Sequence, residues 1–267
     1  MNNRNLLVPH DFTKAAGVAT RYAISLAKKL NAEVNLVHIV KDSKGIPKAN
    51  RKFDEVMRDL EISEDMPKVT PIVRIGDIFT DISALGKELH SSIIVMGTHG
   101  ARGMQKVFGS FAIKIITSTH IPFIIVQEDH QISELEHIVV PIDVSKESLQ
   151  IEQVVSAIAK KANADVKVIA EQHTDTSLKI KTAVNYKVIT EQFDSVGIKY
   201  HTEFIKRLSA KDIIQFTEEN DGDLIGIAYH SDNLLPQFDR IFQDLLMNEK
   251  KFPILIINAK EVGNYFF

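Results

Sequence analysis

The chain has 267 residues and a formal net charge of −3, with 44% hydrophobic and 25% charged residues. This composition is typical of a globular protein with one large domain or two smaller ones, and it argues against general binding to nucleic acid or anionic membranes. Cysteine is absent, which excludes disulfides, thiolate metal sites and cysteine nucleophiles. The chain shows neither a signal-peptide pattern nor an apolar run of the roughly 20 residues that a membrane helix needs. We therefore expect a cytoplasmic protein.

The first half alternates apolar runs with helical patterns. Residues 6–9 predict a buried strand, and Thr13 is placed to cap a helix whose alanines and leucines recur at helical spacing as far as Leu30. Further strands are expected at residues 34–40, 69–75, 92–96 and 122–126, with helices beginning near Phe53, Ile78 and Ser110. The basic segment 41–52, which contains a glycine and a proline, is expected to be a loop.

The second half repeats this pattern. VPHDFT at residues 8–13 matches VPIDVS at residues 140–145, and the block around Gly97 matches the block around Gly226. HIPFIIV matches KFPILII, and the offset stays near 130 residues throughout, which chance similarity would not maintain. The corresponding strands are expected near residues 138–142, 166–170, 199–206, 223–228 and 253–257.

Continuous apolar strands separated by helices indicate parallel sheets that are buried on both faces. We predict an α/β protein with two doubly wound, largely parallel five-stranded sheets, in domains 1–127 and 137–260. Ligands of such sheets bind beyond the carboxyl ends of the strands, where the strand order reverses. The first and fourth strands of the first domain, which end near Asp11 and Gly97, are expected to flank that crevice.

A glycine-rich segment, GTHGARGMQKVFGS at residues 97–110, follows the fourth strand. Its glycines permit close approach of the backbone to a ligand, and successive N–H groups can bind an anion at the start of the next helix. Ser110 stands at that start, and Arg102 is a cation near the first glycines of the segment. The segment lacks the lysine of a P-loop. A turn that merely needs flexible residues is the alternative interpretation.

Asp11 also has two interpretations. Its carboxylate can accept hydrogen bonds from a ribose hydroxyl or a base amine, or it can cap the following helix. Asp143 occupies the equivalent position in the second copy, where the phosphate loop is poor. This repetition favours a partly structural role.

The chain resembles the universal stress protein family in its tandem two-domain form. The resemblance rests on the opening VPHD at residues 8–11 and on Gly97, Gly100, Gly109 and Ser110. The nucleotide-binding members carry G-x2-G-x9-G-S/T, whereas eight residues, 101–108, separate the second and third of these glycines here. The family's fold is Rossmann-like, of the adenine nucleotide alpha hydrolase type.

The resemblance implies an adenine-nucleotide site in the first domain. ATP is the implied ligand, and magnesium accompanies it in such members, although the sequence shows no dedicated metal ligand. The residues expected at the nucleotide are Pro9, Asp11, Ile39, Met96, Gly97, His99, Gly100, Gly103, Gly109, Ser110 and Phe111.

The resemblance also implies an arrangement of the two copies. In the family the last strand of each domain pairs across a dimer interface, so residues 122–126 and 253–257 are expected to pair within this chain as an intrachain pseudo-dimer. Whether such pseudo-dimers assemble into a homo-oligomer, and which protein partner they bind, are left open by the sequence.

The second copy departs from the pattern. Gly226 is followed by Ile227, Ala228 and Tyr229, which makes Tyr229 the expected counterpart of Gly100. No G-S precedes the next helix. A tyrosine would bring a ring into the space that a phosphate needs, so the second domain is expected not to bind ATP in the family's manner.

Other site types receive less support. His10, His38 and His99 lie near strand ends that neighbour one another in this fold, where three imidazoles could bind zinc, although side chains of alternate direction would separate them. The G-x-S-x-G nucleophile elbow is absent, and no catalytic set emerges. We expect a stress-response regulatory protein that binds ATP and is at most a slow ATPase. A scaffold that binds no nucleotide and an ATP-consuming enzyme are the alternatives.

Overall fold

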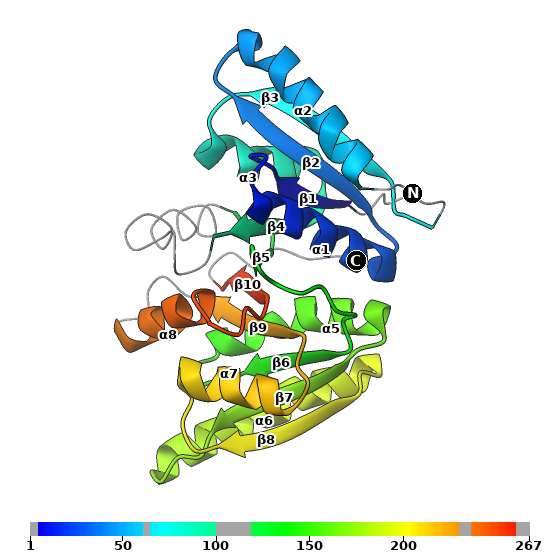
Figure 1. The fold of residues 1–267 in the computed structure, drawn as a ribbon. Helices are drawn as coiled ribbons and strands as arrows, with labels where there is room; N and C mark the ends of the chain where they lie inside the picture. The colour runs from blue at the N-terminus through cyan, green and yellow to red at the C-terminus, as the bar shows by residue number, and fades with distance from the viewer. Residues whose placement is uncertain (1–4, 61–64, 100–118, 230–235, 260–267) are drawn as a thin grey trace. The chain divides into compact units, whose positions relative to one another are not determined.

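The computed structural model describes residues 5–60, 65–99, 119–229 and 236–259. The chain divides into two compact units, Met1–Ile132 and Ser133–Phe266 (Figure 1). Each unit is a five-stranded, parallel, doubly wound α/β sheet, which confirms the predicted fold class. Most strands are apolar runs between helices, as expected for a sheet buried on both faces, but no residue of the strands at 69–75 and 200–205 is buried.

The first unit has the strand order β3-β2-β1-β4-β5, and all four neighbouring pairs are parallel. Its order reverses between β1 and β4, since β2 and β3 lie on one side of β1 while β4 and β5 lie on the other. Its strands are β1 (Asn5–Pro9), β2 (Glu33–Val40), β3 (Val69–Ile75), β4 (Ser91–Thr98) and β5 (Phe123–Gln127).

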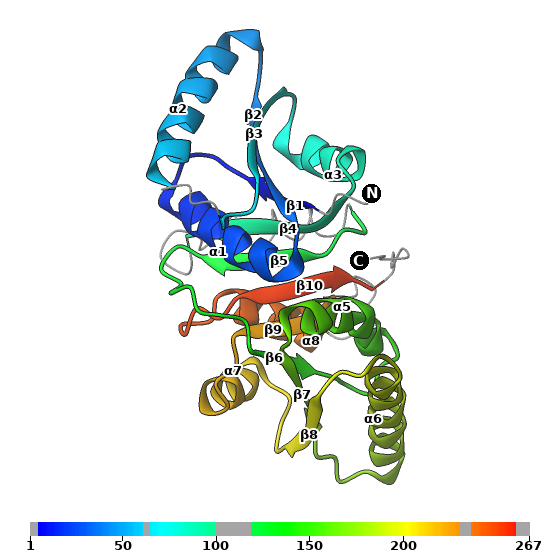
Figure 2. The same ribbon diagram turned by 90° about the vertical axis from the view of Figure 1, so that its right-hand side faces the viewer.

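Helices α1 (Lys14–Leu30) and α2 (Ile46–Asp59) cover one face of this sheet, and α3 (Ile78–Glu88) covers the other (Figure 2). The predicted helical spacing in α1 is confirmed, because its alanines and leucines as far as Leu30 are buried. The prediction of a loop at residues 41–52 is wrong: a 3-10 turn, η1 (Ser43–Gly45), leads directly into α2. Pro47 stands in the first turn of α2, where a missing N–H costs no helical hydrogen bond.

The second unit has the equivalent strand order β8-β7-β6-β9-β10, with every neighbouring pair parallel. Its order reverses between β6 and β9. Its strands are β6 (His137–Pro141), β7 (Asp165–Glu171), β8 (Tyr200–Ile205), β9 (Leu224–Tyr229) and β10 (Ile254–Asn258).

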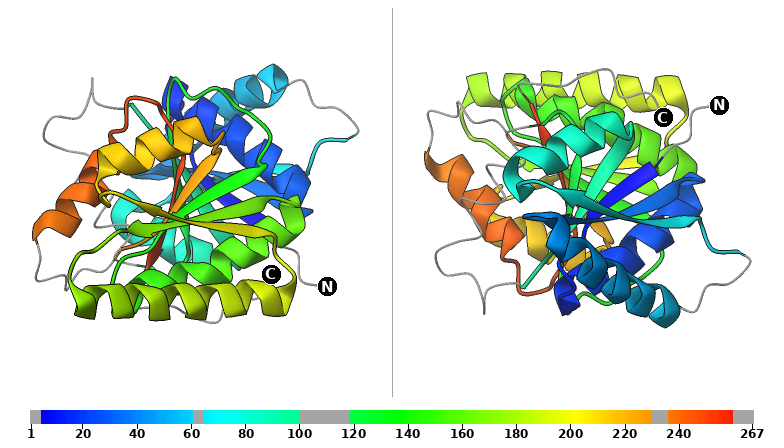
Figure 3. Two further views of the ribbon diagram at one scale, coloured as in Figure 1. Left: turned by 90° about the horizontal axis from the view of Figure 1, so that it is seen from below. Right: turned by 90° about the horizontal axis from the view of Figure 1, so that it is seen from above.

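The helices of the second unit also lie on both faces of its sheet, with α6 on one face and α7 and α8 on the other (Figure 3). They are the 3-10 helix η3 (Glu147–Ile151), α5 (Glu152–Ala162), α6 (Thr176–Val196), α7 (Ala210–Glu219) and α8 (Pro236–Leu246). None of the helices in the described part of the chain is both long and apolar enough to cross a membrane.

The interior of each unit is built from the strands. All five residues of β1 are buried, and Phe53 from α2 and Phe123 from β5 are among the largest fully buried side chains. The central strands β1, β4, β6 and β9 are mainly apolar and buried, whereas Asp11 and Asp143 stand in the turns that follow β1 and β6. Parallel α/β sheets bind ligands at the carboxyl ends of the strands between which the strand order reverses. These are β1 and β4 in the first unit, and β6 and β9 in the second.

Candidate functional site

The turn after β1 positions Asp11. Its Oδ1 accepts hydrogen bonds from the Thr13 N–H at 3.0 Å and the Thr13 hydroxyl at 2.5 Å. Thr13 is the N-cap of α1, and its Oγ1 accepts from the Ala16 N–H at 3.3 Å. In the second unit Asp143 accepts from the N–H and hydroxyl of Ser145 at 2.7 and 2.5 Å. The expectation that Asp11 itself caps the helix is therefore wrong: Thr13 is the N-cap of α1, and Asp11 orients it.

The shared turn makes a testable prediction. Asp11→Ala and Asp143→Ala are each expected to lower the free energy of unfolding by about 1 kcal/mol. Each removes the acceptor that orients a hydroxyl, of Thr13 or Ser145, which itself accepts the backbone N–H three residues later. Urea unfolding of the nucleotide-free protein measures this effect. Asp11→Asn keeps an Oδ1 acceptor and should keep the stability. An Asp11→Ala protein as stable as wild type would mean that Asp11 serves a ligand alone.

A buried histidine completes the turn in the first unit. His10 is 4% exposed, and its Nδ1 accepts the Phe12 N–H at 3.1 Å. His38 Nδ1 lies 2.7 Å from the His10 carbonyl oxygen, so this nitrogen must be the donor. The pKa of His10 is lowered to about 4, mainly by burial; the charge of Asp11 opposes this shift and nearby His38 adds to it. The structure thus holds a neutral imidazole at the end of β1.

Phe12 forms an aromatic cluster at the carboxyl ends of β1 and β2, which the sequence analysis missed. Its backbone has φ of 66°, a left-handed conformation that is strained for a phenylalanine. The ring packs 4.6 Å from that of His38 and 5.0 Å from that of Phe53, and the Lys52 ammonium lies 4.8 Å above it. The signal in the sequence was an aromatic residue directly after Asp11, in a turn where small or polar residues are usual.

The three histidines that suggested zinc are engaged separately. His10 and His38 use their Nδ1 atoms in the turn, and His99 Nδ1 lies 3.0 Å from Glu128 Oε2. Within the described ranges, no three histidine, aspartate or glutamate side chains are grouped so that they could hold a metal ion. The arrangement gives His99 a hydrogen-bond partner in the segment that follows β5.

Gly97 lies where β4 meets the start of α1. A Cβ atom placed on it would come within 2.2 Å of the Ala15 carbonyl oxygen and 2.9 Å of the Ala16 backbone nitrogen. Because these are backbone atoms of a helix, no side-chain rotation can relieve the contact. The absence of a side chain at Gly97 is therefore required by packing, whatever its relation to a nucleotide.

The remaining predicted site residues divide into two groups. Pro9 and Met96 are buried at the adjacent ends of β1 and β4, while Ile39 is half-buried on β2. Thr98, at the end of β4, is 1% exposed and its hydroxyl has no hydrogen-bond partner within the described ranges. The phosphate-loop residues Gly100, Gly103, Gly109, Ser110 and Phe111 lie outside the described residues, and their contacts stay predictions.

The hydrogen-bond register corrects the alignment of the two copies. The Ile94 N–H donates to the Pro122 carbonyl at 2.8 Å, and the Ile225 N–H donates to that of Pro253 at 3.1 Å. Thr98 then pairs with Gln127 as Tyr229 pairs with Asn258. The expectation that Tyr229 replaces Gly100 is therefore wrong, because strand pairing makes it the counterpart of Thr98.

This register also changes the partner of Gly97. Its counterpart is Ala228, which carries the Cβ that Gly97 must lack, and not Gly226. In the second unit the helix after the first strand begins with the 3-10 segment η3 in place of a regular α-helical turn. By counting onward from the same register, Gly100 corresponds to Ser231, which lies outside the described residues.

Comparisons with known proteins agree with this fold. The model of the universal stress protein family matches residues 2–127. A universal stress protein of Methanocaldococcus jannaschii is 26% identical over 141 residues, which are 47% of this chain and 82% of the relative.

Among solved structures, a universal stress protein from Archaeoglobus fulgidus aligns with a TM-score of 0.72 and 17% identity, covering 97% of this chain and 100% of that one. A functionally unknown protein from Pseudomonas aeruginosa aligns with a TM-score of 0.62 and 14% identity, over 96% of this chain and 93% of that one. Both similarities concern the fold. Residues 2–127 are thus similar to the universal stress protein family, and the second unit repeats the same α/β architecture.

Proposed function

We propose that the first unit binds an adenine nucleotide, ATP with magnesium, and that the protein is a stress-response regulator with little or no catalytic turnover. One observation carries the proposal: the strand order of the first unit reverses between β1 and β4, and β4 leads directly into the glycine-rich segment. Parallel α/β sheets bind their ligands at such a reversal, and glycine-rich backbone at a helix start suits phosphate.

The side chains at this reversal fit a nucleoside. Asp11 is exposed and uses Oδ1 within its own turn, which leaves Oδ2 to accept a hydrogen bond from a ribose hydroxyl. The buried Thr98 hydroxyl, unpartnered within the described ranges, is a further polar group that a ligand would satisfy. Lys14 pairs with Asp129 at 2.6 Å, so the phosphates would depend on backbone N–H groups and Arg102.

Calorimetry of the full-length protein with ATP and magnesium tests this proposal. We expect saturable binding of about one ATP per chain. Phosphate release should be slower than about 1 s⁻¹, the lower end of the usual range of enzyme kcat values. ATP should favour one conformation of this protein and thereby change its affinity for a regulatory partner. Absence of binding would favour the scaffold, rapid turnover would favour an enzyme, and two ATP per chain would contradict our assignment of the second unit.

A pair of variants tests where the nucleotide binds. Gly100→Tyr is expected to weaken ATP binding at least about 100-fold, because a Cβ and a ring would stand where the family's loop brings backbone to phosphate. Ser231→Tyr makes the same change at the register-equivalent position of the second unit and should leave ATP affinity unchanged. Equal losses from both variants would argue against binding in the first unit alone.

A further inference from the structure

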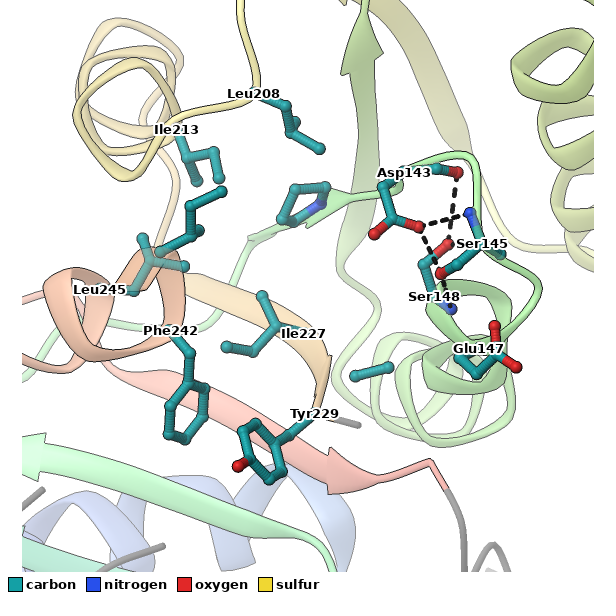
Figure 4. A pocket seen from close by; sticks show the side chains of 13 residues that line it. Asp143, Ser145, Glu147, Ser148, Leu208, Ile213, Ile227, Tyr229, Phe242 and Leu245 are labelled. Carbon is teal, nitrogen blue, oxygen red and sulfur yellow. Dashed lines mark hydrogen bonds between the residues drawn. The ribbon is translucent and has the colours of Figure 1, made fainter. Parts of the chain in front are cut away.

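The second unit has a pocket at its own strand-order reversal, at the carboxyl ends of β6 and β9 (Figure 4). It is open to solvent and has a cavity volume of about 70 Å³. One end is polar and is formed by Asp143, Ser145, Glu147 and Ser148. The opposite wall is apolar and includes Leu208, Ile213, Ile227, Ile241, Phe242 and Leu245. The pocket thus combines a polar end with an apolar wall, as expected of a site for an amphipathic molecule.

The hydrogen bonds of the polar end leave acceptors facing the pocket. The Ser145 hydroxyl donates to Asp143 Oδ1 at 2.5 Å, and the Ser148 hydroxyl donates to the Ser145 carbonyl at 2.9 Å. Both hydroxyl hydrogens are therefore committed within the turn. Among the described residues no hydrogen bond engages Asp143 Oδ2, and Figure 4 shows that this oxygen points towards the apolar wall. A ligand that supplies a donor would complete this end of the pocket.

The charges of the lining select the same kind of ligand. Asp143 and Glu147 are both carboxylates, and the lining residues include no lysine or arginine. A phosphate would face two like charges without a side-chain cation to offset them, whereas an ammonium would gain a charge-assisted hydrogen bond. The pocket is therefore suited to a cation, in contrast to the anion-binding loop of the first unit.

The apolar wall offers surface for a ring. Ile227, Leu208 and Ile241 are only partly buried, although their side chains are entirely apolar. The ring of Phe242 packs against that of Tyr229 in a tilted arrangement, with centroids 4.7 Å apart. Phe242 lies beside these three side chains in the pocket lining. Covering these side chains would remove apolar area from water, which favours binding by roughly 25 cal/mol per Å².

We propose that the second unit binds a small amphipathic amine: an aromatic or alicyclic body against the apolar wall, with its ammonium donating to Asp143 Oδ2. The tandem chain would then carry two different ligand sites built on one fold. The proposal does not depend on ATP binding by the first unit, because every contact that supports it lies in the second.

The probe pair tryptamine and indole-3-propionate tests the proposal, since the two share an indole and a two-carbon chain but carry opposite charges. Calorimetry or saturation-transfer NMR on the full chain should show saturable tryptamine binding, at least tenfold tighter than indole-3-propionate. Excess ATP should leave the tryptamine isotherm unchanged. No tryptamine binding, equal affinities for the two probes, or displacement by ATP would overturn the proposal.

Two variants locate the amine. Asp143→Asn keeps the Oδ1 acceptor of the turn but removes the charge, and should lower tryptamine affinity about tenfold without weakening indole-3-propionate. Ile227→Trp should fill the pocket and abolish binding, with thermal unfolding to verify that the variant folds. Asp165→Asn, at the opposite end of the sheet on β7, removes one carboxylate of this unit and should change nothing. Undiminished tryptamine affinity in Asp143→Asn would overturn the assignment of the ammonium.

Discussion

Gly97→Ala is expected to lower the free energy of unfolding of the first unit by about 3 kcal/mol, the upper end of the usual range for overpacking. The added Cβ would lie 2.2 Å from the Ala15 carbonyl oxygen and 2.4 Å from its carbon. Relief requires the first turn of α1 to move away from β4, which would disturb the N-cap at Thr13 and the buried face of the helix. Urea unfolding followed by circular dichroism, with hydrogen exchange of the β1 and β4 amides to identify the unit, measures the loss.

Gly226→Ala is the matched control in the second unit. The Cβ there would meet Val155 Cγ2 at 3.2 Å and Ile151 Cγ1 at 3.5 Å, and both are side-chain atoms that can shift. The expected change is within about 1 kcal/mol. If Gly97→Ala lowers the free energy of unfolding no more than Gly226→Ala does, then α1 can move away from β4 with little loss of stability. Packing would then not explain the glycine at position 97.

The second large effect is a pH dependence of stability that originates at His10. The pKa of His10 falls from its ordinary value of 6.5 to about 4 in the folded protein, mainly because burial disfavours the imidazolium. The unfolded chain therefore takes up a proton below pH 6.5, while the folded chain stays neutral until near pH 4. Stability from the neutral imidazole is complete above pH 6.5 and is lost as the pH falls through this window. Between pH 7 and pH 5 we expect a loss of about 2 kcal/mol.

His10→Asn tests this assignment. An asparagine oxygen can accept the Phe12 N–H in place of His10 Nδ1, but it does not titrate. The free energy of unfolding of the variant should therefore change about 2 kcal/mol less than that of wild type between pH 7 and pH 5. His201→Asn removes an exposed histidine of β8 and controls for the loss of one titratable side chain. Identical pH profiles for wild type and His10→Asn would place the dependence elsewhere.

The two predictions concern neighbouring parts of one structure. His10 and Phe12 set the conformation of the chain as it leaves β1, and Gly97 lets α1 begin directly against β4. In the proposed function this corner also receives the nucleoside. Measuring ATP affinity in Gly97→Ala and His10→Asn would therefore show how far the corner must be held in place for binding, separately from its effect on stability.

Features that depend on local pattern were predictable from the sequence. The central strands are mainly apolar runs, α1 repeats its small and branched side chains at helical spacing, and the tandem copies share the Pro-x-Asp-x-Thr/Ser opening. Each of these follows from the period of a strand or helix, or from a short turn whose hydrogen bonds are made within a few residues. Segment 41–52 was the exception, because its glycine and proline stand at a helix start and not within a loop.

Features that depend on pairing between distant segments required the tertiary structure. The sequence suggested that Gly97 corresponds to Gly226. The strand register shows instead that Gly97 corresponds to Ala228. The need for glycine at position 97 comes from the backbone of α1, and the low pKa of His10 comes from burial beneath its neighbours. The sequence by itself determined that the chain is a tandem α/β protein whose two copies share one turn after the first strand. Only the tertiary structure decided which residues correspond, which are buried and which face a pocket, because contacts between segments far apart in the chain set all three.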